Sequence, residues 1–268
     1  MVADRTLRST PIYPVTPTGI PRRTLAAGRY RVSFAESAED IAAVQALRFE
    51  VFNLELGEGL AASFETGRDA DPFDDVCHHL LVTDLENDQI VGCYRMQTSA
   101  MAADHEGFYT SSLFDLSVLP ASVVASSMEV GRACVARSHR SKHVLFLLWK
   151  GLALYVAHNQ VRYLFGCCSL TSQDPEEGWA VLRYLERNDH LHPELVIEPT
   201  ERCRLEYADP SDTRVNAVQL PILFRTYLRY GSKVCGVPAI DRDFKTIDYF
   251  VILDVATISE RTHKMFFG

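Results

Sequence analysis

Residues 128–143 read MEVGRACVARSHRSKH. Residues 128–136 are mostly apolar and predict a strand, although Glu129 lies inside them. Basic and hydroxyl residues follow in 137–142, and the apolar residues 143–158 then predict a helix. A strand that leads through a loop into a helix is the repeating unit of an α/β fold. The loop before such a helix presents free backbone N–H groups, which bind phosphate groups well.

The same two kinds of element alternate on both sides of this unit. Short apolar runs and apolar–polar alternation predict further strands over 30–34, 79–83, 90–96, 163–170, 202–207 and 249–255. Helical spacing predicts helices over 41–54, 176–188 and 220–230. Ser37 followed by Asp40 resembles a capping box before the first of these helices. The elements interleave without an internal repeat, so we predict one α/β domain with a mixed sheet over residues 29–268.

Residues 1–28 differ from the rest of the chain in composition. They contain four prolines among Ser, Thr and Arg, and residues 1–31 hold six arginines against one acid, Asp4. Such a segment buries too little apolar surface to order itself, so we predict a disordered tail. The tail is either a spacer or a basic segment that contacts anionic lipid headgroups at the inner face of the membrane.

Composition narrows the class of protein. The net charge of −8 argues against a general nucleic-acid binder, which needs a basic surface. The seven cysteines include no C-x-x-C pair, so we predict neither a disulfide framework nor a metal site. Reduced cysteines indicate a cytoplasmic protein. The apolar run 144–157 is interrupted by Lys150 and falls short of the roughly 18 residues that a membrane span needs.

Glu129 lies in an apolar strand, where a carboxylate is costly to bury unless it is paired or takes part in chemistry. Aminolysis of a thioester needs a neutral amine, and a desolvated carboxylate can take the proton that an α-ammonium group carries. Two interpretations stay open: Glu129 is a general base, or it forms a structural ion pair with Arg132. The two side chains face opposite sides of an ideal strand, unless Gly131 marks a bulge.

The basic loop after the strand also has two interpretations. Arg137, Arg140 and Lys142 can form charge-assisted hydrogen bonds with the phosphate of a phosphopantetheine arm, which is carried by coenzyme A or by an acyl carrier protein. Alternatively, these residues form a solvated basic turn that binds no ligand.

Several residues together resemble the pattern of acyl-homoserine-lactone synthases. They are Arg48 and Phe52, Asp71 and Asp74, Arg95, and Glu129 with Arg132. Those enzymes have the GNAT fold and acylate the amine of an amino-acid-like substrate from acyl carrier protein. The resemblance implies that these residues organise the substrate site, with Arg48 and Asp74 in an ion-pair network. This chain departs from that family because no Trp precedes Trp149, whereas the family has one soon after the Phe.

A more extensive resemblance, to ornithine-lipid N-acyltransferases, covers most of residues 30–260. The segments that recur in similar form are 129–132, 147–152, 163–167, 220–229 and 234–244. The resemblance extends to long-chain N-acyl amino acid synthases and to proteins called haemolysin-like. It implies a GNAT-like mixed, twisted central sheet flanked by helices, with Glu129 as the base and no permanently bound cofactor. It also implies transfer of a (3-hydroxy)fatty acyl group from the phosphopantetheine of acyl carrier protein to the α-amine of an amino acid, expected to be ornithine.

The loop over 137–142 departs from many GNAT enzymes, whose pyrophosphate loop is rich in glycine. It contains no glycine, which weakens the case for coenzyme A and favours an acyl carrier protein, whose acidic surface needs basic partners. Asp241 and Asp243 are candidates for holding the side-chain ammonium of ornithine, or they cap the turn before the last strand. The alternatives are another acceptor such as glycine or tyrosine, a homoserine-lactone signal synthase, and a non-catalytic acyl-carrier or lipid-binding protein.

Overall fold

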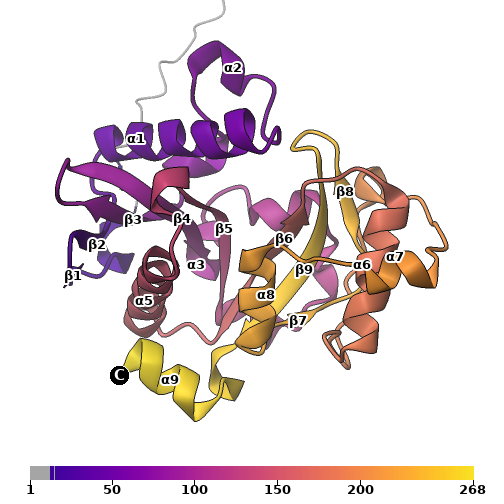
Figure 1. The fold of residues 1–268 in the computed structure, drawn as a ribbon. Coiled ribbons are helices and arrows are strands. Elements are labelled where there is room, and N and C mark those ends of the chain that lie inside the picture. The colour runs from indigo at the N-terminus through magenta and orange to yellow at the C-terminus, as the bar shows by residue number, and fades with distance from the viewer. Residues whose placement is uncertain (1–12, 15) are drawn as a thin grey trace, which may run out of the picture.

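The computed structural model describes residues 13, 14 and 16–268 (Figure 1). Within residues 16–28, Ile20 is buried, and the strand β1 (Leu25–Ala27) pairs with the next strand of the sheet. Backbone pairing and apolar burial order this segment, so the prediction of a disordered tail is wrong for residues 16–28. Residues 1–12 and 15, which belong to the predicted tail, lie outside the described residues. The contact of the tail with lipid stays a prediction.

One mixed sheet contains the nine strands of the described residues. Its order is β1–β2–β3–β4–β5–β6–β9–β7, and β8 also pairs with β9. Neighbouring strands are antiparallel, except that β5 and β6 are parallel. Beyond β1, the strands are β2 (Tyr30–Phe34), β3 (His78–Asp84), β4 (Gln89–Thr98), β5 (Ser127–Val135), β6 (Tyr163–Leu170), β7 (Lys233–Val234), β8 (Ala239–Asp241) and β9 (Thr246–Asp254).

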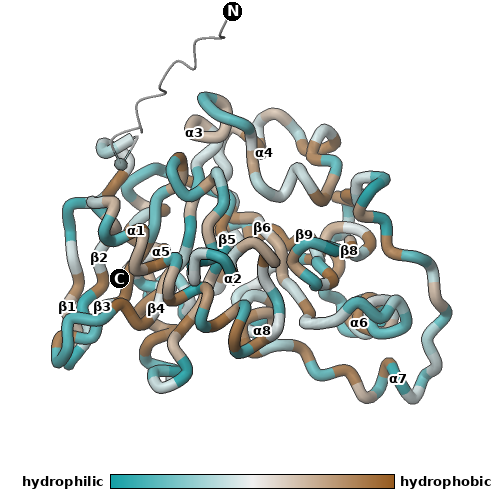
Figure 2. Tube along the Cα trace, turned by 90° about the horizontal axis from the view of Figure 1, so that it is seen from above, coloured by the Kyte–Doolittle hydropathy of each residue, from teal (hydrophilic) through white to brown (hydrophobic). Residues whose placement is uncertain are grey.

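Helices cover the sheet on both sides, which confirms the predicted α/β class with a mixed sheet. The helix α5 packs against β2, β3 and β4, whereas α1 packs against β4 and β5 from the opposite side (Figure 1). Seen from above, β1 and β8 lie at opposite ends of the sheet, and α6 and α7 lie near the β8 end (Figure 2). The helices are α1 (Ala38–Arg48), α2 (Ser63–Thr66), α3 (Ser99–Ala103), α4 (Ala121–Ala125), α5 (Lys142–Asn159), α6 (Pro175–Arg187), α7 (Asp212–Asn216), α8 (Ile222–Arg229) and α9 (Glu260–Phe267).

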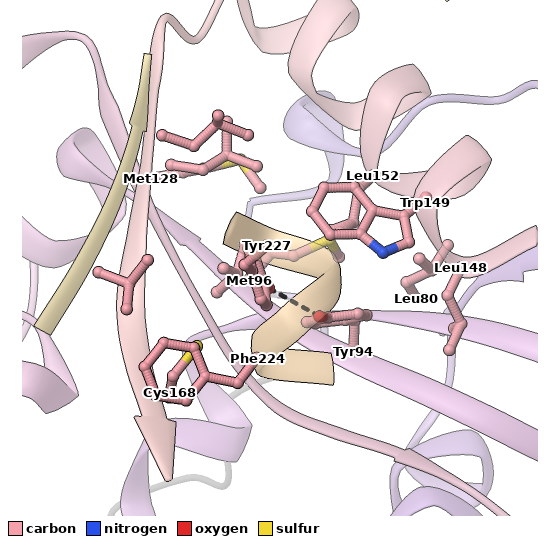
Figure 3. Packing of buried hydrophobic residues seen from close by; sticks show 14 of the residues in the cluster. Leu80, Tyr94, Met96, Met128, Leu148, Trp149, Leu152, Cys168, Phe224 and Tyr227 are labelled. Carbon is pink, nitrogen blue, oxygen red and sulfur yellow. Dashed lines mark hydrogen bonds between the residues drawn. The ribbon is translucent and has the colours of Figure 1, made fainter. Parts of the chain in front are cut away.

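The main hydrophobic core lies between α5, α8 and the sheet (Figure 3). Leu148 and Trp149 of α5 are buried there together with Leu80 of β3. Tyr227 of α8 and Tyr94 of β4 meet inside this core through their hydroxyl groups, whose oxygens are 2.7 Å apart. Burial of large apolar side chains is the main stabilising contribution to such a core. Among the described residues, no helix is both long enough and apolar enough to cross a membrane.

Two local predictions have different outcomes. The capping box at Ser37 and Asp40 is confirmed, and α1 continues as a π-helical segment, η2 (Phe49–Glu55). The predicted strand over 202–207 is wrong, because the segment forms a 3-10 turn over Glu201–Cys203 followed by one isolated β-bridge. Its alternating pattern therefore places side chains in the core without adding a strand to the sheet.

The strands β5 and β6 lie side by side for only part of their length. Their parallel pairing covers Ser127–Glu129 and Tyr163–Phe165, and no backbone pairing joins the remainder of these two described strands. Gly166 follows directly, and a Cβ atom built there would lie 2.2 Å from the carbonyl oxygen of Val130. Only glycine allows this close approach. Beyond it, side chains from both strands line a cavity.

Candidate active site

A cavity of about 290 Å³ opens where β5 and β6 separate. Polar side chains reach it from β4, β5, β6, β9 and the 3-10 turn η4 (Tyr109–Ser112). Phe52 of η2, predicted as a site residue, lines it and packs edge-on against Phe244, with 5.5 Å between ring centroids. Leu223 and Phe224 of α8 add to the apolar wall. An apolar wall with a few convergent polar groups is typical of a small-molecule site.

Glu129 lies on β5 at this cavity and is 7% exposed. Its Oε1 accepts hydrogen bonds from the backbone N–H of Thr110 at 2.7 Å and from the Thr110 hydroxyl, and Oε2 accepts one from the backbone N–H of Tyr109 at 2.8 Å. Burial raises the pKa of Glu129, and the Thr110 and Tyr109 donors together with Arg95 offset only part of this. Oε2 keeps a lone pair that no hydrogen bond from a described residue uses, so it can take a proton from a ligand.

A β-bulge brings Glu129 and Arg132 to the same cavity. The register between β4 and β5 shifts between Cys93 and Arg95, and Arg132 has a φ of 50°. The extra residue breaks the alternation of side chains, so both Glu129 and Arg132 line the cavity. The guanidinium of Arg132 contacts Asp71 at 3.0 Å and forms no ion pair with Glu129. The interpretation of Glu129 and Arg132 as a structural ion pair is therefore wrong.

The predicted arginines and aspartates form one buried network beside the cavity. Asp74 accepts hydrogen bonds from Arg48 Nη1 at 2.8 Å and from Arg95 Nη1 at 2.9 Å, while Asp71 contacts both Arg95 and Arg132. Burial alone would raise the pKa of Asp74, but Arg48 and Arg95 hold it well below its ordinary value. The network joins α1, β4, β5 and the loop before β3, which confirms the predicted ion-pair network, and its part in organising the substrate site stays a prediction.

The predicted phosphate-binding residues lie in the loop between β5 and α5. Arg137, Arg140 and Lys142 are exposed. Arg140 forms a two-pronged ion pair with Glu55, with Nη2 at 2.8 Å from Oε2, so its guanidinium is already occupied. No ion pair among the described residues involves Arg137 or Lys142. The loop leads directly into the N-terminus of α5, and its role in binding phosphate stays a prediction.

The structure separates the two aspartates that were candidates for binding an ammonium. Asp241 lines the cavity, but its Oδ1 accepts hydrogen bonds from the backbone N–H groups of Asp243 and Phe244, at 3.0 and 2.8 Å. These bonds confirm the turn-capping interpretation for Asp241. The Asp243 side chain is 72% exposed, lies outside the cavity and forms an ion pair with Arg202 at 3.6 Å. The predicted ammonium contact is therefore wrong for Asp243, because its side chain points into solvent.

Sequence reasoning missed several polar residues of the cavity, and three of them are buried acids or amides. Asp248 of β9, Glu58 and Gln97 of β4 line it and are 3%, 6% and 1% exposed. Asp248 lies one residue before the predicted strand over 249–255, so the sequence did not mark it as an acid inside an apolar strand. Glu58 lies in an acidic loop where any one carboxylate looks like the others, and Gln97 is a neutral residue near the end of its strand. Only the fold shows that Asp248, Glu58 and Gln97 reach the cavity.

Asp248 is expected to lower the stability of the folded protein at neutral pH. Burial, with Asp241 and Glu58 nearby, raises its pKa to about 6, although the hydroxyls of Ser169 and Thr246 donate hydrogen bonds to it. A folded-state pKa above the ordinary value means that its contribution to stability falls as pH rises from about 4 to 6. Asp248→Asn removes this effect. We expect its Tm to exceed that of the wild type at pH 7.5, by a stabilisation of at most about 3 kcal/mol, and to match it at pH 4. Thermal unfolding at both pH values measures this, and a lower Tm than wild type at pH 7.5 contradicts it.

The sequence is similar to known acyltransferases. Residues 47–150 match the family of Acetyltransferase (GNAT) domains. The chain is 34% identical over 247 residues to the L-ornithine N(alpha)-acyltransferase of Brucella abortus (strain 2308), covering 87% of each. It is 33% identical over 247 residues to the protein of the same name from Rhodobacter capsulatus, covering 89% of this chain and 94% of that one. The chain belongs to the L-ornithine N(alpha)-acyltransferase family.

Family membership makes this chain an acyltransferase and confirms the resemblance inferred from its sequence. It favours an enzyme over the non-catalytic acyl-carrier or lipid-binding protein. Among solved structures, the acyltransferase is similar to the AHL synthase LasI, at 11% identity and a TM-score of 0.49, covering 90% of this chain and 96% of that one. It is also similar to FeeM, an N-acyl amino acid synthase from uncultured soil microbes, at 10% identity and a TM-score of 0.47, covering 85% and 92%.

Proposed function

We propose that this acyltransferase moves a (3-hydroxy)fatty acyl group from the phosphopantetheine thioester of an acyl carrier protein to the α-amine of ornithine. The observation that carries the proposal is Glu129, a buried carboxylate with a raised pKa and an available lone pair at the cavity where β5 and β6 separate. The relatives' name supports ornithine as the acceptor. The acidic lining of the cavity suits a substrate that has two amino groups.

The proposed reaction is aminolysis of the thioester. Glu129 Oε2 takes a proton from the α-ammonium, which leaves a neutral amine. The amine nitrogen attacks the carbonyl carbon and forms the C–N bond, and the carbonyl electron pair moves onto oxygen. Backbone N–H groups on the unpaired edge of β5 beyond Glu129 can hold this oxyanion. Collapse breaks the C–S bond, the leaving thiolate takes one of the two protons on the nitrogen while the amide keeps the other, and Glu129 returns its proton to solvent.

Arg132 is the residue best placed to receive the α-carboxylate of the acceptor. Its guanidinium lies over the rings of Phe244 and Tyr109, at 4.3 and 4.9 Å from their centroids. Arg132 lines the same cavity as Glu129, and its buried Nε lies 3.5 Å from Asp69 Oδ1, an ion-pair contact without a hydrogen bond. An arginine guanidinium matches a carboxylate in geometry and charge, so Arg132 at the cavity can receive one. Asp71 holds the other side of the guanidinium and fixes its orientation.

Acyl carrier protein is proposed as the donor on the basis of the loop between β5 and α5. Arg137 and Lys142 are exposed there, and the loop ends at the N-terminus of an 18-residue helix. A helix N-terminus and two nearby cations favour a phosphate group and an acidic protein surface. Past Glu129 and Phe165, the separated strands present backbone groups that an extended pantetheine arm can pair with.

We expect the purified enzyme to convert ornithine with acyl carrier protein as donor faster than with acyl-coenzyme A. Replacing both Arg137 and Lys142 by Glu should raise the KM for acyl carrier protein by about tenfold at low salt, because electrostatic attraction assists the encounter. The increase should shrink at high salt, and kcat should change little. Initial rates with mass-spectrometric detection of the product measure both quantities.

Lys264→Glu is the matched control, since Lys264 is an exposed lysine on α9 and its charge reversal should leave the KM unchanged. Equal or faster turnover with acyl-coenzyme A would contradict the proposed donor. An N-acyl product that forms from glycine or tyrosine but not from ornithine would contradict the proposed acceptor.

A further inference from the structure

The buried carboxylates of the described residues fall into two groups. Those of the first group each contact an arginine, and they are Asp69, Asp74 and Asp84. Those of the second group line the cavity without an ion pair to any described residue, and they are Glu58, Glu129, Asp241 and Asp248. A carboxylate that is buried without a cation raises the free energy of the folded state. The second group therefore favours a positively charged ligand.

The carboxylates of the second group differ in whether their hydrogen-bond donors are backbone N–H groups or side-chain hydroxyls. Glu129 and Asp241 accept backbone N–H groups and so fix the turns that follow them in space. Asp248 accepts only the hydroxyls of Ser169 and Thr246, and Glu58 accepts only the hydroxyl of Thr171. A hydroxyl can rotate to donate elsewhere or to accept, whereas a backbone N–H cannot. Apart from the proposed base Glu129, Asp248 and Glu58 are thus the two carboxylates of the cavity whose hydrogen-bond donors among the described residues are hydroxyls alone, and these donors can yield to a ligand.

Asp248 and Glu58 come from distant parts of the chain and act on one another. Asp248 lies on β9, and Glu58 lies in the loop after η2. Glu58 is one of the charges that, together with burial and Asp241, raise the pKa of Asp248 to about 6, and burial raises the pKa of Glu58 as well. Repulsion between the two carboxylates is relieved when a cation lies between them.

Gln97 gives an independent sign that the cavity receives a polar ligand. It is 1% exposed, it lines the cavity, and neither its Oε1 nor its Nε2 has a hydrogen-bond partner among the described residues. It lies directly opposite Glu129 in the pairing of β4 with β5. A buried primary amide without partners is unfavourable, and a ligand with both donor and acceptor groups, such as an amino acid, supplies them.

We propose that Asp248 and Glu58 hold the side-chain ammonium of the acceptor and thereby select a diamino acid. The inference rests on the proposed function, and it assigns selectivity to residues separate from Glu129. An ammonium has three N–H donors, which two carboxylates and a neighbouring hydroxyl can accept. A neutral side chain in the same place leaves both carboxylates unpaired, which disfavours that substrate. The described residues contain no group of three or more His, Cys, Asp or Glu that could hold a metal ion instead.

The test compares L-ornithine with L-norvaline, which has the same carbon chain but lacks the side-chain amine. We expect wild-type kcat/KM for ornithine to exceed that for norvaline by about 10³-fold. Asp248→Asn should lower kcat/KM for ornithine by about 10²-fold, chiefly through KM, and leave norvaline within about threefold of wild type. Glu58→Gln should also lower the ratio of kcat/KM for ornithine to kcat/KM for norvaline. Because it lies in a different element, it gives a second test if Asp248→Asn folds poorly.

Asp243→Asn is the matched control, because Asp243 is an exposed aspartate beside the same turn and outside the cavity. It should keep the wild-type ratio. Wild-type selectivity for ornithine that persists in folded Asp248→Asn and Glu58→Gln overturns the inference and leaves the proposed function standing. If the wild type uses ornithine and norvaline equally well, the inference is also overturned and the proposed function still stands. Failure of the wild type to acylate ornithine at all overturns the proposed function, and the inference with it.

Discussion

Replacing Glu129 by Gln is expected to lower kcat by about 10²–10⁴, the usual contribution of a positioned general base. The variant keeps the size of the side chain but cannot take the proton from the α-ammonium. The affinity for acyl carrier protein should change little, because Glu129 is buried away from the surface loop that carries Arg137 and Lys142. The remaining activity should rise with pH as more of the amine is neutral. Steady-state rates from pH 6 to 9 measure both effects.

Thr110→Val tests how the hydrogen bond to Glu129 sets the pKa of the proposed base. It removes the hydroxyl that donates to Glu129 Oε1 but leaves the base in place. That hydrogen bond lowers the pKa of Glu129, so its loss should move the acidic limb of the rate profile to higher pH and reduce kcat only modestly. If a folded Glu129→Gln protein kept a near-normal kcat, Glu129 would not be the general base. The membership of the chain in its family would be unaffected.

Replacing Asp74 by Ala is expected to destabilise the protein by about 3–5 kcal/mol, because it leaves two buried guanidinium groups without their shared carboxylate. Arg48 is fully buried and Arg95 is 5% exposed, so water cannot replace the lost partner. Gln45 loses a hydrogen bond of 3.0 Å at the same time. Chemical denaturation followed by circular dichroism measures the free energy of unfolding.

Asp75→Ala is the natural comparison for Asp74→Ala. Asp75 is the next residue of the same 3-10 turn, but it is exposed, and its substitution should change stability by less than about 0.5 kcal/mol. Equal unfolding free energies for the two variants would show that the arginine network is not a major source of stability. Loss of activity in both, at unchanged stability, would instead give the turn a part in catalysis.

The long elements of the fold were predictable because their apolar patterns are strong. The strand β6 has the predicted bounds, and α5 differs by one residue at each end from the prediction over 143–158. The short strands β7 and β8 were not predicted, since two or three residues are too few to establish an alternation. The strand expected over 202–207 had the alternation but no neighbouring strand to pair with along its length.

The site residues that could be predicted are those marked by their neighbours in the sequence. Those that depend on contacts between distant segments could not be predicted. Glu129 could be found because a carboxylate in an apolar strand is visible in the sequence itself. The bulge at Arg132 could only be suggested, because it depends on the register with β4. Glu58 and Gln97 could not be found, since their neighbours in space come from other parts of the chain. Asp248 could not be found by the criterion that found Glu129, because it precedes the predicted strand over 249–255, and only pairing with β6 and β8 extends β9 back to Thr246.

The position of β9 determines when the cavity can form as the chain is synthesised. This strand lies between β6 on one side and β7 with β8 on the other, and it brings Asp248 to the cavity. A chain that leaves the ribosome N-terminus first completes α1, α5 and β6 early, but it cannot close the cavity until β9 has emerged. Until then β6 presents an open edge, a template for pairing with other chains. We therefore expect fragments that end before β9 to leave this edge of β6 unpaired and to lack activity.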